Sequence, residues 1–200
     1  MKIRNLFTIA GCAVILTACI PSVNPFYTDK DLVFDTRLLG DWQKKGRTNA
    51  VDVWTFEQAD AKTYKLTVTE KKGKRGQFLA RLFKLDEQYF LDIVPIDCGH
   101  PETQAELVTA SIFPGHLLLR VSQVEPELRL AFFNFGWLAK HLEANPNALA
   151  HHKEDKRIIL TASTDDLQRF VLRRLGEGKL FGTPEEMLRK GGVAPAAIPK

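Results

Sequence analysis

The sequence predicts one α+β domain that is mainly β, in which an antiparallel meander of short strands forms a barrel or a sandwich and two or three helices follow. Three observations support this class. Apolar and polar residues alternate in short runs between residues 51 and 133, which is the pattern of half-buried strands. Short polar turns separate these runs and favour hairpins. Amphipathic segments that carry helix-capping residues begin only after residue 133.

The clearest strand is at residues 64–69, where Tyr64, Leu66 and Val68 alternate with lysine and threonine. This period of two places the three apolar side chains on one face of a sheet. Runs rich in β-branched and aromatic residues predict further strands. The predicted strands are residues 51–56, 64–69, 78–85, 89–94, 106–112, 116–124, 127–133 and 157–162.

Capping residues define the predicted helices. Asn134 precedes a segment in which Trp137, Leu138, His141 and Leu142 share one helical face. A second helix follows Ser163, which opens a capping box, and ends near Gly176. A third, short helix is predicted after Thr183, with Pro184 at its first position and Gly191 after it.

Composition is that of an ordinary globular chain, with 44% hydrophobic and 26% charged residues. The formal net charge is +4, and removal of Lys2 and Arg4 with a signal peptide would leave about +2. This balance argues against a nucleic-acid partner, which would require a strongly basic face. A chain of this length buries one core, so one domain is expected.

The N-terminus has the pattern of a secretory signal peptide. Lys2 and Arg4 precede an apolar segment at residues 6–16, which is too short to span a membrane as a helix. A basic start, a short apolar middle and small residues before a cleavage site are typical of such signals.

Residues 16–19, with the sequence LTAC, resemble the lipobox of bacterial lipoproteins. The resemblance implies cleavage between Ala18 and Cys19 and attachment of a diacylglyceryl group to the Cys19 thiol. Residues 9–12 also fit the box, but Cys12 would leave an apolar segment shorter than signal peptides need. A buried core cysteine is the remaining alternative. Two or three acyl chains on Cys19 would anchor the chain to a membrane stably.

The lipobox divides the chain into a signal peptide at residues 1–18, the lipidated cysteine with a linker at 19–36, a β-rich domain with C-terminal helices at 37–190, and a flexible tail at 191–200. By analogy with the sorting habit of lipoproteins, Ile20 in place of aspartate implies the outer membrane, on its periplasmic side, if the host has two membranes.

Gly40-Asp41-Trp42 resembles the Gly-x-Trp start of the first strand in lipocalin-like barrels. The resemblance implies that Trp42 closes one end of a barrel. It is limited to three residues, and a helix before the last predicted strand departs from the lipocalin order. The mature chain is also similar in style to small uncharacterised bacterial lipoproteins, a likeness that implies no function.

These features predict a non-catalytic binding role, with either a small apolar ligand or an envelope protein as the partner. Trp42, Trp54, Phe56 and Phe132 are the candidate ligand-lining residues, and plain core packing is the alternative interpretation of such aromatic residues. The alternative function is a structural or assembly component of the envelope without a ligand.

An enzyme that uses Cys98 and His100 is the third hypothesis. The two residues lie on one short polar segment that has no second cluster of metal ligands. We therefore predict no catalytic residues, no metal and no cofactor. His116 is interpreted as a residue at a strand end. Lysines and arginines cluster at residues 44–47 and 71–75. Either they are solvated side chains in turns, or they bind anionic lipid headgroups at the membrane.

Overall fold

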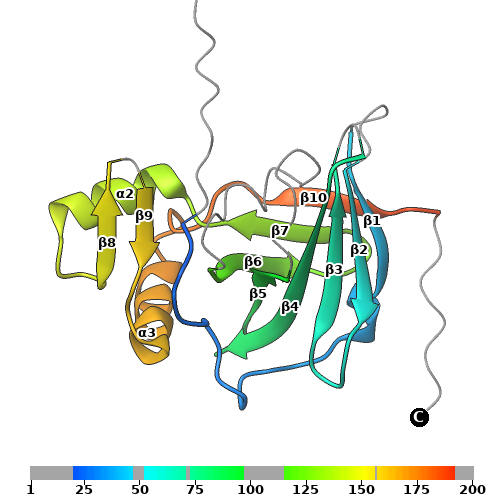
Figure 1. The fold of residues 1–200 in the computed structure, drawn as a ribbon, viewed down its shortest axis with the longest axis horizontal. Helices are drawn as coiled ribbons and strands as arrows, with labels where there is room; N and C mark the ends of the chain where they lie inside the picture. Colours follow the sequence, from blue (N-terminus) through cyan, green and yellow to red (C-terminus); the bar gives the residue numbers. More distant parts are fainter. Residues whose placement is uncertain (1–19, 47–51, 71–72, 97–114, 156, 192–200) are drawn as a thin grey trace, which may run out of the picture.

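The computed structural model describes residues 20–46, 52–70, 73–96, 115–155 and 157–191. Its main body is a closed eight-stranded antiparallel barrel, and two helices and a separate two-stranded sheet lie beside it (Figure 1). The predicted class, α+β and mainly β with a barrel-forming meander, is confirmed. Among the described residues no helix is both long enough and apolar enough to cross a membrane.

Seven strands follow one another around the barrel in chain order, and the last strand closes it. The barrel strands are β1 (Gly40–Lys44), β2 (Val53–Gln58), β3 (Tyr64–Thr69), β4 (Arg75–Leu85), β5 (Gln88–Pro95), β6 (Leu117–Gln123), β7 (Leu128–Phe132) and β10 (Glu185–Arg189). The other elements are the 3₁₀ turn η1 (Thr36–Leu38), α2 (Phe135–Ala144), β8 (His151–Glu154), β9 (Arg157–Leu160) and α3 (Thr164–Leu175). β10 pairs with β1 on one side and with β7 on the other.

The period-two pattern of the sequence produces the interior of the barrel. In β3, Tyr64, Leu66 and Val68 are buried while the residues between them are partly exposed. Strands are found at seven of the eight predicted segments, with ends displaced by up to a few residues. The predicted strand at residues 106–112 lies outside the described residues. The polar strand β8 was not predicted, since His151–Glu154 has no apolar alternation.

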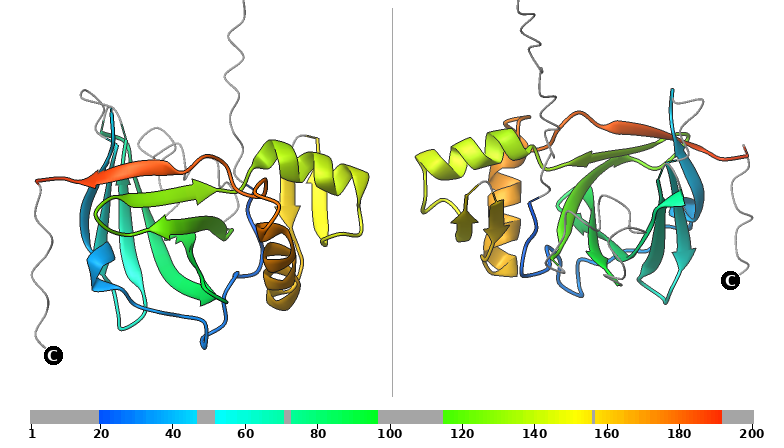
Figure 2. Two further views of the ribbon diagram at one scale, coloured as in Figure 1. Left: turned by 180° about the vertical axis from the view of Figure 1, so that it is seen from behind. Right: turned by 45° about the horizontal axis from the view of Figure 1, so that its top comes forward.

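A second apolar core lies between the outer face of the barrel and the helical part of the chain. Phe90 of β5 and Leu118 of β6 face outward, because their neighbours along each strand fill the interior. They pack in one cluster with Leu138 of α2 and Phe170 of α3. Figure 2 shows α2, α3 and the β8–β9 hairpin grouped on one side of the barrel. The barrel wall is therefore buried on both faces at this side.

Both long helices start at their predicted caps. The Asn134 side chain accepts a hydrogen bond from the Trp137 amide at 3.1 Å and starts α2. Ser163 Oγ accepts one from the Asp166 amide at 3.2 Å and starts α3. These side chains satisfy amide groups that the first turn of a helix leaves unpaired.

The third predicted helix is wrong, because Glu185–Arg189 is strand β10. Its residues favour a helix locally, and the Thr-Pro start imitates a helix cap. Pairing with β1 and β7 outweighs this local preference, since it satisfies the backbone groups of two strand edges at once. Only Met187 of this strand is buried, which left little apolar periodicity for the sequence to show.

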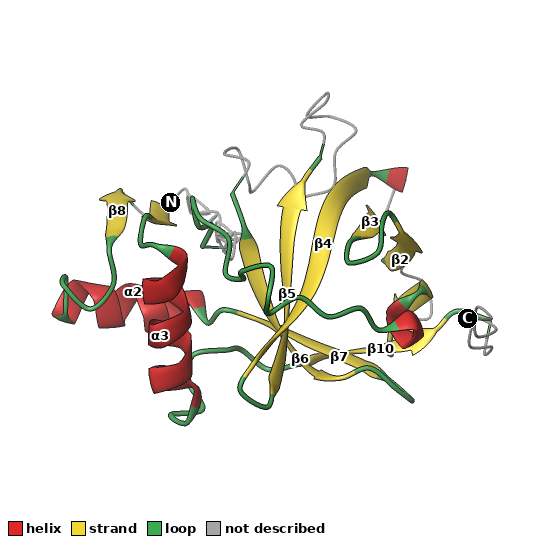
Figure 3. Cartoon of the chain, turned by 90° about the horizontal axis from the view of Figure 1, so that it is seen from below, coloured by secondary structure: helices red, strands yellow, loops and turns green. Residues whose placement is uncertain are grey.

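The predicted linker at residues 19–36 requires correction for residues 20–36, which are built into the fold. The Ser22 and His116 backbones exchange two hydrogen bonds of 2.8 Å. Farther on, the Val33 amide donates to the Leu82 carbonyl at 2.9 Å. Figure 3 shows this segment passing over β5 and β4 to reach η1. Its proline and asparagine residues predict a loop, and the segment is indeed irregular. Its apolar side chains nevertheless pack into or against both cores.

Replacement of Phe26 tests whether this segment stabilises the domain. Phe26 is 1% exposed in the second core, and its ring meets Phe133 edge-on at 5.8 Å. We expect Phe26→Ala to lower the free energy of unfolding by about 3–5 kcal/mol, measured by urea denaturation. Val23 in the same segment is 45% exposed, and Val23→Ala should change it by less than about 0.5 kcal/mol. Equal effects of the two variants would show that the segment is not part of the folded core.

Candidate functional site

The four aromatic residues predicted to line a ligand cavity lie inside the barrel. Trp42, Trp54 and Phe56 are buried, and Phe132 is partly buried against the same core. The Trp54 ring lies 6.3 Å from the Phe56 ring and 6.4 Å from the Phe132 ring, measured between centroids. Within the described residues the four side chains belong to a packed core, and neither of the two clefts described below is lined by any of them.

Trp42 lies at the end of the barrel that η1 covers. Its indole Nε1 donates a hydrogen bond to the Leu38 carbonyl at 2.8 Å, and both side chains are fully buried. The Arg189 guanidinium carbon lies over the indole ring, 4.3 Å from its centroid. An arginine stacked on tryptophan combines dispersion with attraction between the cation and the π-system. Trp42 therefore joins η1 to the closing strand β10.

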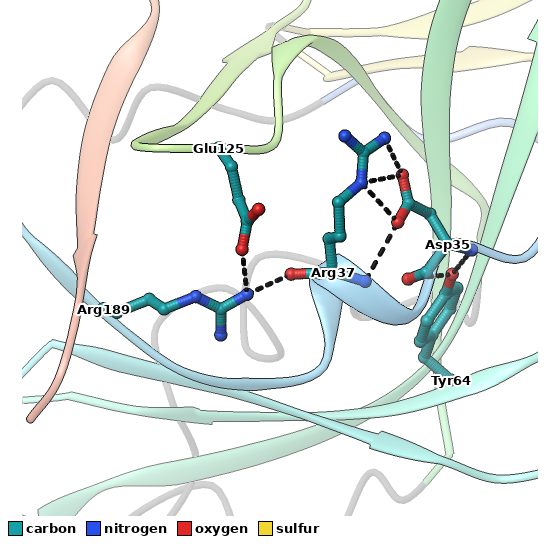
Figure 4. Close-up of polar contacts among 5 residues, drawn as sticks. All are labelled: Asp35, Arg37, Tyr64, Glu125 and Arg189. Atoms are coloured by element: carbon teal, nitrogen blue, oxygen red, sulfur yellow. Dashed lines mark hydrogen bonds and ion pairs between the residues drawn. The ribbon is translucent and has the colours of Figure 1, made fainter. Parts of the chain in front are cut away.

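Arg189 is the polar hub of this end of the barrel (Figure 4). Its side chain is 10% exposed. It donates to the Leu39 carbonyl at 2.9 Å, to the Arg37 carbonyl, and to the Glu125 carboxylate at 3.0 Å. These bonds connect β10 to η1 and to the loop between β6 and β7, and they leave the guanidinium charge compensated by Glu125.

Asp35 and Arg37 form the second charged pair at this end (Figure 4). The Arg37 guanidinium donates to both carboxylate oxygens of Asp35, at 2.9 and 2.6 Å. Burial alone would raise the pKa of Asp35, but the hydrogen bonds and positive charge of Arg37 outweigh it, so this pKa lies below its ordinary value. The Tyr64 hydroxyl accepts from the Asp35 amide at 2.6 Å, and burial raises the pKa of this phenol well above its usual value.

A cleft of about 180 Å³ opens beside these pairs, and we name it the mouth cleft. It lies where Tyr89 of β5 and Val121 of β6 face each other across neighbouring strands near η1. Its lining residues are Asp35, Arg37, Leu82, Tyr89, Val121, Ser122, Gln123, Val124 and Glu125. The charges on its rim are already paired with each other or with Arg189, so the mouth cleft presents hydrogen-bonding groups without an uncompensated charge.

A second cleft, of about 190 Å³, lies on the outer face of β6 and β7, and we name it the lateral cleft. The chain between α3 and β10 forms its far wall. Its lining residues are Arg120, Ser122, Ala131, Leu175, Gly178, Leu180, Phe181, Gly182 and Pro184. Arg120 is the one charged residue of this lining. Its Nη2 donates to the side-chain oxygen of Gln88 at 2.7 Å.

A buried polar cluster lies on the outer wall of the barrel above the lateral cleft. Asp92 is fully buried and accepts a hydrogen bond from the Phe26 amide at 3.0 Å. His116 Nδ1 lies 2.7 Å from the other Asp92 oxygen. The Tyr27 ring packs edge-on against His116, and Arg81 lies over Tyr27. His116 lies directly before β6, and the bonds of Phe26 to Asp92 and of Ser22 to the His116 backbone fasten the N-terminal segment to the barrel.

The candidate reactive residues Cys98 and His100 lie outside the described residues. His116 and His141 are held by different partners, since His141 stacks on Trp137 at 4.8 Å, and burial lowers the pKa of His141. Within the described ranges, no three histidine, cysteine, aspartate or glutamate side chains gather closely enough to hold a metal ion.

Ion pairs hold Lys44 and Lys45 of the first basic cluster. Lys44 pairs with Glu185 of β10, and Lys45 lies 2.8 Å from Glu127 and 3.1 Å from Glu186. These lysines connect β1 to the closing strand and its neighbour. Such exposed pairs contribute at most about 1 kcal/mol each.

Sequence reasoning missed Arg189, Asp35, Arg120 and Asp92. The partners of Arg189, Arg120 and Asp92 lie far away in the chain, so no local spacing indicated these residues. Asp35 pairs with Arg37 two residues later, but its other partner, Tyr64, is distant. The one available signal was position within a strand. Asp92 and Arg120 interrupt otherwise apolar runs at residues 89–94 and 117–121, and a charged residue there faces either solvent or a specific partner.

A scan against protein-family models, a search of curated proteins and a search of solved structures each found no match to this chain.

Replacement of Arg189 tests whether it holds the barrel end closed. Arg189→Met would keep an apolar stem over Trp42 but would leave two backbone carbonyls and Glu125 without a donor. We expect the free energy of unfolding to fall by about 1–3 kcal/mol, measured by urea denaturation. Arg169→Met, which removes an exposed arginine paired with Asp166 on α3, should cost less than about 1 kcal/mol. A loss at Arg189 no larger than at Arg169 would contradict this role.

Proposed function

We propose that the protein is a lipid-anchored lipoprotein of the bacterial cell envelope, held by Cys19, and that its barrel domain has a non-catalytic binding role. In a host with two membranes, its place is the periplasmic side of the outer membrane. The lipobox at residues 16–19 is the sequence basis of the anchor.

One structural observation supports the proposal: the residues that follow Cys19 in the sequence pack into the domain. Ile20 is 3% exposed in the second core. The Pro21 carbonyl accepts from the Leu160 amide of β9 at 2.9 Å, and the Ser22 backbone pairs with His116. A lipid on Cys19 would therefore hold the domain close to the bilayer, because Pro21 and Ser22, which follow it in the sequence, are bonded to the β8–β9 hairpin and to the chain before β6.

The packing of the barrel supports binding at the surface of the domain rather than among the predicted lining residues. Trp42, Trp54, Phe56 and Phe132 contact one another or other core residues. The two clefts on the described residues lie at the η1 end and on the outer wall. An eight-stranded antiparallel barrel with a tryptophan at its covered end is compatible with the lipocalin-like resemblance of Gly40-Asp41-Trp42. In this proposal the likeness concerns architecture, and the ligand or envelope partner binds outside.

Membrane fractionation tests the anchor. Cys19→Ser removes the thiol that would carry the lipid, and one or more acyl chains supply the affinity for the bilayer. We expect the variant to move from the membrane fraction to the soluble fraction, measured by immunoblot after ultracentrifugation of lysed cells.

Cys12→Ser is the matched control, because Cys12 belongs to the rival lipobox. It should leave the protein in the membrane fraction. Release by Cys12→Ser, or retention of Cys19→Ser in the membrane fraction, would overturn anchoring through Cys19.

Native mass spectrometry of the protein extracted from the envelope separates the two kinds of binding partner. A co-purified small molecule would favour a ligand. A bare protein mass would favour an envelope partner or the structural alternative, which crosslinking in intact cells would then examine.

A further inference from the structure

Arg120 differs from the other arginines whose Nε is buried without an acceptor. Within the described residues these are Arg120, Arg129 and Arg189. Arg129 pairs with Glu127 and Glu186, at 3.3 and 3.2 Å, and Arg189 pairs with Glu125. For Arg120 the structure gives one hydrogen bond, to the neutral amide of Gln88, and no carboxylate of the described chain within ion-pair distance. Within the described residues, no carboxylate pairs with its positive charge.

The position of Arg120 would allow an anionic ligand to reach its guanidinium group. It stands on the outer face of β6 and lines the lateral cleft. A partly buried guanidinium has lost part of its hydration, so an anionic oxygen that reaches it gains a charge-assisted hydrogen bond that water does not fully replace. Partly desolvated arginines are therefore frequent binding sites for carboxylate and phosphate groups.

Apart from Arg120 and Ser122, the residues that line the lateral cleft are apolar or glycine, and backbone hydrogen bonds hold its wall in place. Leu180, Phe181 and Ala131 are buried side chains of its wall, and Leu175 and Pro184 extend it. The wall is fastened to the barrel by two backbone bonds, from Asn134 to the Leu180 carbonyl at 2.8 Å and from Gly182 to the Phe132 carbonyl at 2.9 Å. Preformed clefts with an apolar lining and one oriented polar group are typical of small-molecule sites.

We propose that the lateral cleft binds a small amphiphilic anion, with its carboxylate or phosphate head on Arg120 and its short apolar body against Leu175, Leu180 and Phe181. The volume of about 190 Å³ limits the ligand to a short chain or a single ring. This inference rests on the proposed binding role and names its ligand class, but it does not depend on the lipid anchor.

Titration of the full chain in a nonionic detergent tests the site. The probes are hexanoate, hexyl phosphate, hexanol and acetate, measured by calorimetry and by the NMR signals of the arginine Nε–H groups. Hexanoate or hexyl phosphate should bind with a dissociation constant below about 1 mM, and the tighter of the two identifies the head group. Hexanol, which lacks the charge, and acetate, which lacks the chain, should each bind at least about tenfold more weakly.

Variants locate the binding at Arg120. Arg120→Gln should weaken binding at least about tenfold and should leave the melting temperature nearly unchanged, because it strands no carboxylate. Ser122→Glu keeps Arg120 but places a carboxylate two residues along the same strand face, and it should weaken binding similarly. Arg129→Gln is the matched control and should bind like the wild type, because Arg129 does not line the lateral cleft.

Three results would overturn the proposal. One is the absence of hexanoate and hexyl phosphate binding up to about 10 mM. The second is equal binding of hexanol or acetate. The third is unchanged binding in folded Arg120→Gln and Ser122→Glu. None of these results bears on membrane anchoring, which the Cys19→Ser fractionation decides separately.

Discussion

Closure of the barrel by β10 is the constraint on which the rest of the structure depends. Without it, β1 and β7 would each expose an unpaired edge, which sheets avoid. β10 pairs with both strands, places Met187 in the interior core and brings Arg189 onto Trp42. Because α2, the β8–β9 hairpin and α3 lie between β7 and β10 in the chain, they must form their own layer outside the barrel, and the second core is the result.

The N-terminal segment joins the two cores. It begins at Ile20 among the outer elements, pairs with β6 through Ser22, crosses β4 and ends in η1, where Leu38 enters the barrel core. One continuous run of chain therefore connects the position of the proposed anchor with the mouth cleft. If Cys19 carries the lipid, both clefts stay close to the bilayer surface.

At the η1 end and on the outer wall of the barrel, most buried charges in the described residues have a specific polar or charged partner. Asp35 with Arg37, and Glu125 with Arg189, neutralise each other at the η1 end, where they hold loops in place. Asp92 is buried but accepts from Phe26 and lies against His116. Of the three arginines whose Nε is buried without an acceptor in the described part of the chain, Arg120 is the one whose side-chain partner is neutral. Arg189 at the barrel end is paired with a carboxylate, whereas Arg120 in the lateral cleft is paired with a neutral amide. This difference indicates the lateral cleft as the place where an anion would bind.

The sequence by itself determined the local structure: the alternation at residues 64–69 and its counterparts predicted the strands, and Asn134 and Ser163 predicted the starts of α2 and α3. It also marked Trp42, but not the arginine above it. Only the tertiary structure decided that Glu185–Arg189 is a strand, that Ile20 and Phe26 enter the second core, and that no described carboxylate pairs with Arg120. The physical reason is that periodicity and capping act between neighbours in the chain, whereas edge pairing, burial and charge compensation depend on residues brought together from distant positions by closure of the barrel.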